Sequence, residues 1–258
     1  MSNTSTGLIQ RIVSRGMLLA ALAITAACTT PETVGHDGVG VFDPYEAENR
    51  RIHAFNKGLD SNVVKPLATT YDAVLIDSME DSVSAFASNL SVPGSVINQV
   101  LQGDLPAATR QTVRFTLNST LGIAGLFDIA TDLGVPEEEA DFGQTLAVWG
   151  LPQGTYLELP ALGPASERDA AGKIVDFALN PLRGLEQPAA GIATGARIGA
   201  RLGQRGRFGS TIDSVLYESV DSYATTRDIY LQNRAFELGE AATDVEDSED
   251  PYADIFGE

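Results

Sequence analysis

The stretch DPYEAENRRIHAFNKGLD, residues 43–60, has the pattern of an amphipathic helix and indicates the fold class of the chain. Asp43 can cap a helix, Pro44 suits the first helical position, and Glu46 lies three residues beyond Asp43. The apolar residues then fall on one stripe at helical spacing, and these are Tyr45, Ile52, Phe55 and Leu59. We therefore predict an amphipathic helix that begins at Asp43.

Similar start signals recur downstream. The predicted segments open at Asp104 before Pro106, at Asp141 (ending near Gly150), at Ser166 with Asp169 (covering Lys173–Leu179), and at Asp213, which should open the longest helix. Only Thr155–Leu159, between Gly154 and Pro160, is predicted to be extended. The expected fold is mainly α, a single domain of many short amphipathic helices.

Composition limits the classes of function. The 258 residues hold 17 Lys and Arg against 35 Asp and Glu, a formal net charge of −18, which disfavours nucleic-acid binding. No internal stretch reaches about 18 uninterrupted apolar residues, so no internal membrane span is predicted. Short amphipathic helices can pack into a soluble core or lie in one membrane leaflet, and composition does not choose between these.

The N-terminal residues look like a signal peptide. Arg11 and Arg15 precede an apolar run, Met17–Ala27, that is too short to span a bilayer. Thr25-Ala26-Ala27-Cys28 resembles the lipobox of bacterial lipoproteins, although an ordinary thiol at Cys28 is the alternative. We expect a signal peptide at 1–27, lipidation of Cys28, a tether at 28–41, a helical domain at 42–236 and an acidic flexible tail at 237–258.

Catalytic motifs are missing from the sequence. The two histidines, His36 and His53, have no partner at metal-ligand spacing, and neither H-E-x-x-H nor G-x-S-x-G nor S-x-x-K occurs. Cys28, the only cysteine, would be consumed by acylation. We therefore expect a protein that is not an enzyme, with no metal and no cofactor apart from the lipid on Cys28.

A set of short motifs resembles the MlaA/VacJ family, and their order and spacing carry the resemblance. The first half contains Asp43-Pro44-Tyr45-Glu46, Asn49-Arg50, Phe55-Asn56, Leu59-Asp60, Lys65-Pro66, Asn89-Leu90, Pro93, Asn98, Leu101-Gln102-Gly103, Arg114-Phe115, Asn118, Gly122, Gly125 and Phe127-Asp128. The second half contains Asp141–Leu146, Tyr156, Leu159-Pro160, Gly163-Pro164, Arg168-Asp169, Asp221-Ser222-Tyr223 and Arg227–Arg234. Ala165 and the Gly-, Arg- and Ala-rich stretch 183–209 depart from the family pattern.

The resemblance implies an outer-membrane lipoprotein with a lipid anchor in the periplasmic leaflet. Such proteins remove mislocalised phospholipids from the outer leaflet and pass them to a soluble periplasmic lipid carrier. The implied architecture is a flat, ring-like assembly of helices that is membrane-embedded in one leaflet and bound by a trimeric outer-membrane porin.

The candidate site residues follow from the same motifs. The lipid-path candidates are Phe55, Asn56, Asp60, Lys65, Asn89, Asn98, Asn118, Gly122, Gly125 and Asp128. Several have plain alternatives, since Phe55 could belong to the apolar stripe, the asparagines to turns and caps, and the glycines to close helix contacts. Arg197 and Arg201, one helical turn apart, could contact a lipid headgroup or an acidic partner, or form a solvated basic face.

Two further hypotheses remain beside lipid transport. A lipid-anchored periplasmic scaffold of an envelope complex would be soluble once its acyl anchor is removed, whereas a ring within a leaflet would still need detergent. A membrane-associated hydrolase lacks the expected motifs, and phospholipid turnover by the purified protein would revive it.

Overall fold

The computed structural model describes residues 43–180 and 184–239. The predicted signal peptide at 1–27, the tether at 28–41 with Cys28, and the tail from Glu240 onward lie outside the described residues.

Helices dominate the described residues, with one hairpin. The elements are α2 (Glu46–Leu59), η1 (Asp60–Val64), α3 (Lys65–Val74), α4 (Asp77–Asn89), α5 (Val92–Gln102), α6 (Leu105–Thr120), α7 (Ile129–Asp132), α8 (Phe142–Val148), β1 (Tyr156–Leu159), β2 (Gly163–Ser166), α9 (Glu167–Leu179), α10 (Ala189–Arg207), α11 (Gly209–Asp213), η3 (Ser214–Glu218) and α12 (Ser222–Glu237), where η1 and η3 are π-helical. The prediction of a mainly α single domain is confirmed.

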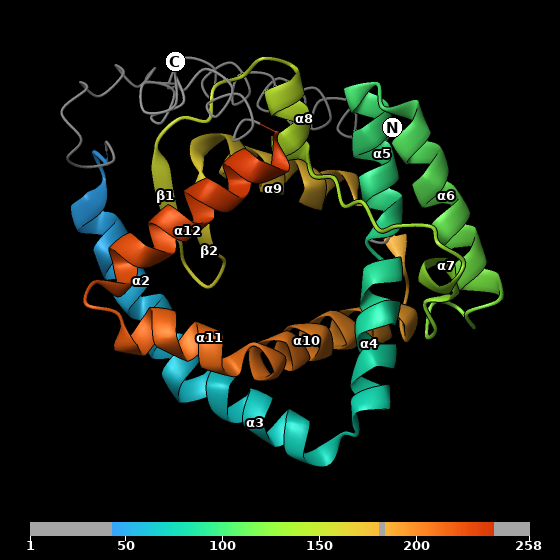
Figure 1. Cartoon of the computed structure of the whole chain (residues 1–258), viewed down its shortest axis with the longest axis horizontal. Helices are drawn as coiled ribbons and strands as arrows, with labels where there is room; N and C mark the ends of the chain where they lie inside the picture. The colour runs from blue at the N-terminus through green and yellow to red at the C-terminus, as the bar shows by residue number, and fades with distance from the viewer. Residues whose placement is uncertain (1–42, 181–183, 240–258) are drawn as a thin grey trace, which may run out of the picture.

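The helices follow one another around a central space (Figure 1). The long helix α10 lies along α3 and also packs on α4, while α5 pairs with α6 and α8 with α9. The antiparallel hairpin β1–β2 pairs Tyr156 with Ser166, and α12 contacts β2 and η3. Segments far apart in sequence thus close the ring.

Three predicted helix starts are confirmed by their caps. The Asp104 carboxylate accepts a hydrogen bond from the Ala107 amide at 2.9 Å and begins α6. Asp141 forms a capping box with Gln144 at the start of α8. Ser166 accepts from the Asp169 amide at 3.1 Å and begins α9, which starts earlier than the predicted Lys173. Short polar side chains before an apolar run gave these starts correctly.

The predicted cap at Asp43 is wrong. The N-cap of α2 is Tyr45, and no side chain caps this helix. Asp43 instead accepts hydrogen bonds from Asn49 Nδ2 at 3.2 Å and from the hydroxyl of Tyr223, 180 residues away in sequence. A long-range contact outcompeted the local one.

The predictions for the C-terminal third need two more corrections. Asp213 does not open the longest helix but ends the short α11, and its carboxylate binds Lys65 and Arg205. The longest helix among the described residues is α10, at 19 residues. The strand Thr155–Leu159 is confirmed as β1, whereas its partner β2 was not predicted.

Glycines let α10 lie close to its neighbours. A Cβ added at Gly199 would lie 3.1 Å from Val83 Cγ1 and 3.3 Å from the Tyr71 hydroxyl oxygen. A Cβ at Gly203 would lie 3.4 Å from the Tyr71 ring. Gly199 and Gly203, within the stretch that departs from the family pattern, therefore let α10 pack closely on α3 and α4.

Burial is inverted relative to an ordinary soluble domain. Among the described residues, no Leu, Ile, Met, Phe or Trp is buried, and the buried apolar side chains are mostly alanines. The buried set is instead dominated by polar and charged side chains, whereas large apolar ones such as Phe177, Ile174 and Val74 are 66%, 67% and 74% exposed. Soluble proteins usually show the opposite, with charged side chains almost never fully buried unless paired.

The inversion is visible within α2 alone. Its buried residues are Asn49 and His53, whereas Tyr45 and Phe55 of the predicted apolar stripe are 47% and 57% exposed. Ile52 and Leu59 of the stripe are partly buried, so none of the four apolar side chains is fully buried.

Candidate functional site

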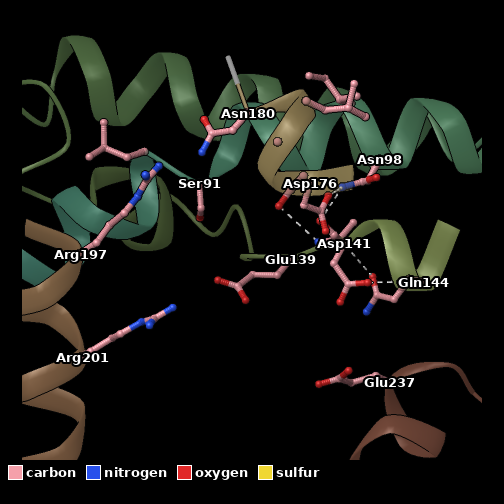
Figure 2. A pocket seen from close by; sticks show the side chains of 16 residues that line it. Ser91, Asn98, Glu139, Asp141, Gln144, Asp176, Asn180, Arg197, Arg201 and Glu237 are labelled. Carbon is pink, nitrogen blue, oxygen red and sulfur yellow. Dashed lines mark hydrogen bonds between the residues drawn. The ribbon is translucent and has the colours of Figure 1, made fainter. Parts of the chain in front are cut away.

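A pocket of about 620 Å³ opens between several helices that border the central space. Its wall comes from the junction of α4 and α5, from segment 139–144, from the end of α9, from α10, and from Glu237 at the end of α12. Figure 2 shows Arg197 and Arg201 extending from α10 into this space, with Glu139 and Glu237 on other parts of its wall.

The two arginines of the pocket have no ionic partner in the part of the chain that the structure describes. Neither the Arg197 nor the Arg201 guanidinium forms an ion pair or hydrogen bond with any described residue. The next arginine along α10 differs, since Arg205 is buried and binds Asp60 and Asp213 with N–O distances of 2.6–2.9 Å. The pocket thus displays two positive charges free to bind a ligand.

Most pocket carboxylates are held by other groups. Asp176 accepts from Asn98 Nδ2 at 2.8 Å and from the Phe142 amide at 3.0 Å. Asp141 and Glu237 both bind Arg234, with N–O distances of 2.8–2.9 Å. These carboxylates are occupied in holding the pocket wall together.

Glu139 is the exception. Its carboxylate has no hydrogen-bond or ion-pair partner among the described residues. Burial in the concave wall raises the pKa of the Glu139 carboxyl, and the negative charges of Glu137, Glu237 and Asp141 raise this pKa further. A positively charged ligand group beside Glu139 would relieve this repulsion.

Arg234 joins the wall elements around Glu139. Its guanidinium, 7% exposed, bridges Asp141 before α8, Asp169 on α9 and Glu237 at the end of α12. Burial lowers the pKa of Arg234 on its own, but the Asp141, Glu237 and Asp169 carboxylates more than offset this and raise it. Three segments distant in sequence are therefore fixed to one side chain.

The pocket brings together Asn98, Arg197 and Arg201 of the residues predicted from sequence. The other lipid-path candidates lie in contacts between elements, so their proposed role stays a prediction. Sequence reasoning did not single out Glu139, whose signal would have been the acidic run 137–139 directly after Pro136.

Three candidates from the N-terminal region hold the ring together. Asn56 donates to the Leu159 carbonyl at 3.0 Å and accepts from the Ala161 amide at 2.7 Å, which fastens the hairpin turn. Asp60 binds Arg205, and Lys65 Nζ lies 2.7 Å from Asp213 Oδ2. Phe55, beside Asn56, is exposed.

The other candidates shape the connection from α6 to α7. Asp128 caps α7 and binds Arg114 at 2.6 Å, and Asn118 donates to Asp128 at 3.0 Å. Gly125 has φ +95°, and a Cβ there would meet the Asn89 side chain. The last two candidates are Asn89, which donates to Ser119 at 3.1 Å, and Gly122, where a Cβ would meet backbone of Asn118 and Phe127.

A second, apolar pocket of about 460 Å³ lies on another side of α10. It is lined by side chains of α3 and α4, by Ala124 and Leu126, and by Ile192, Gly195, Ala196 and Gly199 of α10. One helix therefore contributes both to a charged pocket and to an apolar one.

Ser222 and the buried His53 and Glu158 stand in the order of a hydrolytic triad. His53 Nε2 lies 3.1 Å from Ser222 Oγ, and His53 Nδ1 lies 3.6 Å from Glu158 Oε1. Such a triad also needs free backbone N–H groups for the oxyanion. The amides of Tyr223 and Ala224 instead donate to the Asp221 carboxylate, whose negative charge opposes an oxyanion. We therefore interpret this set as structural.

The described ranges contain neither a candidate membrane-spanning helix nor a candidate metal cluster. None of the helices there is both long enough and apolar enough to cross a membrane. Within the same ranges, no cluster of three or more His, Cys, Asp or Glu residues is arranged to hold a metal ion.

Comparison with known proteins identifies the relatives. The family described as "MlaA lipoprotein" matches residues 41–237. The intermembrane phospholipid transport system lipoprotein MlaA of Escherichia coli is 31% identical over 231 residues, which cover 84% of this chain and 87% of that protein. An uncharacterized protein of Rickettsia felis is 41% identical over 143 residues, 55% of this chain. The chain spans little more than half the length, 57%, of that relative.

A solved structure agrees with these relatives. The structure described as "Structural basis for maintenance of bacterial outer membrane lipid asymmetry" is 30% identical, with a TM-score of 0.67. The match covers 77% of this chain and 100% of that chain. Sequence and fold therefore agree, and the chain belongs to the MlaA lipoprotein family.

Proposed function

We propose that this protein is an outer-membrane lipoprotein that removes mislocalised phospholipids from the outer leaflet and passes them to a soluble periplasmic carrier. The activity of the whole protein is inferred from relatives named for intermembrane phospholipid transport and from a related structure described by outer membrane lipid asymmetry. Its result would be that the outer leaflet stays free of phospholipid.

The inverted burial carries this proposal. Many large apolar side chains are exposed, while polar and charged side chains are buried and mostly paired. Exposed apolar surface is unfavourable in water and favourable among acyl chains, at roughly 25 cal/mol per Å². We accordingly propose that the described residues lie in one leaflet, anchored by acyl chains on Cys28.

The two pockets beside α10 support a route for an amphipathic molecule. A phospholipid has a charged headgroup and apolar chains, and a charged group left in hydrocarbon costs several kcal/mol. The charged pocket offers Arg197, Arg201 and Glu139 to a headgroup, and the apolar pocket offers contact to acyl chains. Moving the lipid along such a route needs no covalent step, so the protein acts without being an enzyme.

Two partners belong to the proposal. A trimeric outer-membrane porin would contact exposed apolar side chains of the helical domain. A soluble periplasmic lipid carrier would receive the phospholipid. Both rest on resemblance to the family. The alternative, a lipid-anchored scaffold without lipid transport, is separated from this proposal by the experiments below.

The first experiment measures phospholipid in the outer leaflet of cells that lack the protein. We expect a rise that wild type and the Arg51→Ala control reverse, since Arg51 is exposed and pairs only with Glu48. The Cys28→Ala variant, without an acyl anchor, should not reverse it. An unchanged outer leaflet, with the protein present in wild-type cells, would refute the transport role.

A second experiment tests the leaflet placement. Cys28→Ala protein should need detergent to stay in solution, because its large apolar side chains are still exposed. If this variant is monomeric and soluble in buffer, the leaflet proposal is wrong. That result would favour the alternative of a lipid-anchored scaffold.

A further inference from the structure

We propose that the charged pocket binds the headgroup of a zwitterionic phospholipid, with the phosphate at Arg197 and Arg201 and the ammonium group at Glu139. This inference rests on the proposed phospholipid transport and adds the headgroup class. Its basis is that the pocket holds charges of both signs that no residue in 43–180 or 184–239 pairs with.

The cationic side is suited to a phosphate. Arg197 and Arg201 lie four residues apart on α10, so their side chains leave the same helix face. A guanidinium group can donate two parallel hydrogen bonds to phosphate oxygens. Two neighbouring arginines therefore suit a phosphate. Neither guanidinium is engaged by a described residue, whereas Arg205 and Arg234 are buried and paired.

The anionic side is suited to an ammonium group. Asp141, Asp176 and Glu237 are bound to Arg234, Asn98 or backbone amides, which leaves Glu139 as the carboxylate without a described partner. Glu139 stands among carboxylates that repel its charge. A ligand that brings a cation to this position compensates that repulsion.

The arrangement distinguishes headgroups by charge. Phosphatidylethanolamine and phosphatidylcholine carry both a phosphate and a cationic amine, so they match both sides of the pocket. Phosphatidylglycerol has the phosphate alone and leaves Glu139 uncompensated. Since one partly solvated ion pair contributes up to about 1 kcal/mol, we expect about fivefold tighter binding of the zwitterionic lipids.

The test uses the full-length lipidated protein in detergent, with phosphatidylethanolamine, phosphatidylcholine and phosphatidylglycerol of identical acyl chains competing against a fluorescent phospholipid. Wild type should bind both zwitterionic lipids about fivefold more tightly than phosphatidylglycerol. Glu139→Gln should weaken only the zwitterionic lipids and so remove the preference. The double variant Arg197→Ala with Arg201→Ala should weaken all three. The controls Glu48→Gln and Arg51→Ala, which change the same charges on an exposed face of α2, should match wild type.

Soluble competitors identify the source of the headgroup. Glycerophosphoethanolamine has the same headgroup without acyl chains and should compete at much higher concentration than the lipid. Inorganic phosphate should compete more weakly still, since it lacks the ammonium group. If glycerophosphoethanolamine competes as well as the lipid, the pocket binds a free headgroup and the inference is wrong.

The remaining outcomes separate this inference from the proposed function. Phospholipid that binds with equal affinity whatever its headgroup, or a preference that survives in folded Glu139→Gln protein, overturns the inference and leaves transport intact. A wild-type protein that binds no phospholipid overturns both.

Discussion

Two regions of the molecule use the same residue types in opposite ways. The polar cluster of α2, formed by Asn49, His53, Tyr156, Glu158 and Tyr223, is buried, and its side chains bind one another or neighbouring groups. The charged pocket beside α10 displays arginine and glutamate side chains that bind no described residue. Pairing, rather than residue type, separates the architectural polar groups from those available to a ligand.

The α2 polar cluster shows how complete such pairing can be. Asn49 donates to the Tyr156 carbonyl at 3.0 Å and accepts from the Glu158 amide at 3.0 Å, so α2 completes the backbone pairing of β1. Burial alone would raise the pKa of the Glu158 carboxyl, yet the nearby His53 ring, 3.6 Å away, and hydrogen bonds donated by Tyr156 and Asn56 lower it. Glu158 is thus held as a carboxylate inside the protein.

The largest expected effect is at Arg234, where pairing extends to the edge of the pocket. Arg234→Ala removes the cation of Asp141 and leaves the buried Asp169 with only the 3.9 Å pair to Arg168, and breaking a buried pair costs about 3–5 kcal/mol. The free energy of unfolding should fall by this amount in denaturant titrations in detergent. Arg110→Ala, which removes an exposed pair with Glu138, is the matched control and should cost less than about 1 kcal/mol. Equal losses in the two variants would contradict the distinction.

A smaller loss is expected for Asn49→Ala. The change leaves the Tyr156 carbonyl and the Glu158 amide buried without a partner, at a cost of about 2–3 kcal/mol. The midpoint of thermal unfolding should fall accordingly, whereas Glu48→Ala on the exposed face should leave it nearly unchanged. A shift no larger than that of Glu48→Ala would mean that the α2 polar cluster is not architectural.

A moderate effect is expected for Asp221→Ala. Asp221 caps α12 and binds Arg50 at 2.7 Å, and the loss of a cap costs about 1 kcal/mol. In the wild type, hydrogen bonds from Arg50 and backbone amides lower the pKa of Asp221 to about 2. Because the folded pKa is the lower one, this contribution is present above about pH 4 and is lost as pH falls towards 2. Acid titration of stability should show a smaller loss over this range for Asp221→Ala, and an identical profile would contradict the assignment.

The smallest effects on stability are expected in the pocket itself. Arg197→Ala and Arg201→Ala remove no described pair, so the free energy of unfolding should change by less than about 0.5 kcal/mol. Glu139→Gln should leave stability unchanged or raise it, because the folded protein penalises the charged carboxylate. The raised pKa of Glu139 means that wild type loses stability as pH rises from about 4.3 to that higher pKa, and Glu139→Gln should lack this loss. Strong destabilisation by any of the three variants would mean that the pocket side chains stabilise the fold and are not available to a ligand.

The helix content and several boundaries could be predicted because they depend on local chemistry. Asp104, Asp141 and Ser166 cap helices through amides three residues away, and such short-range signals are visible in sequence. Asp43 and Asp213 are aspartates like Asp104 and Asp141, yet neither side chain caps a helix. Asp43 instead binds Tyr223, and Asp213 binds Lys65 and Arg205. A pattern in one sequence cannot distinguish a cap from a long-range partner.

The pocket was predictable only in part. Arg197 and Arg201 stood out because they are clustered on one helix of an acidic chain, and Asn98 because of a family motif. Glu139 lines the same pocket as these arginines only through long-range packing, in which Arg234 joins the segments of α8, α9 and α12, and no local spacing reveals this. The direction of the apolar stripe of α2 was also hidden, since periodicity defines a face without saying what covers it.

The glycines of α10 have a consequence for the order of folding. Five glycines within Ala189–Arg207 each cost about 1 kcal/mol relative to alanine, so this helix is unstable alone. Its hydrogen bonds should form only once α3 and α4 offer Tyr71 and Val83 as a docking surface. We therefore expect α10 to be completed late and its amides to exchange with deuterium before those of α6. Arg197 and Arg201 would then reach the charged pocket only when α10, the last helix to form, is complete.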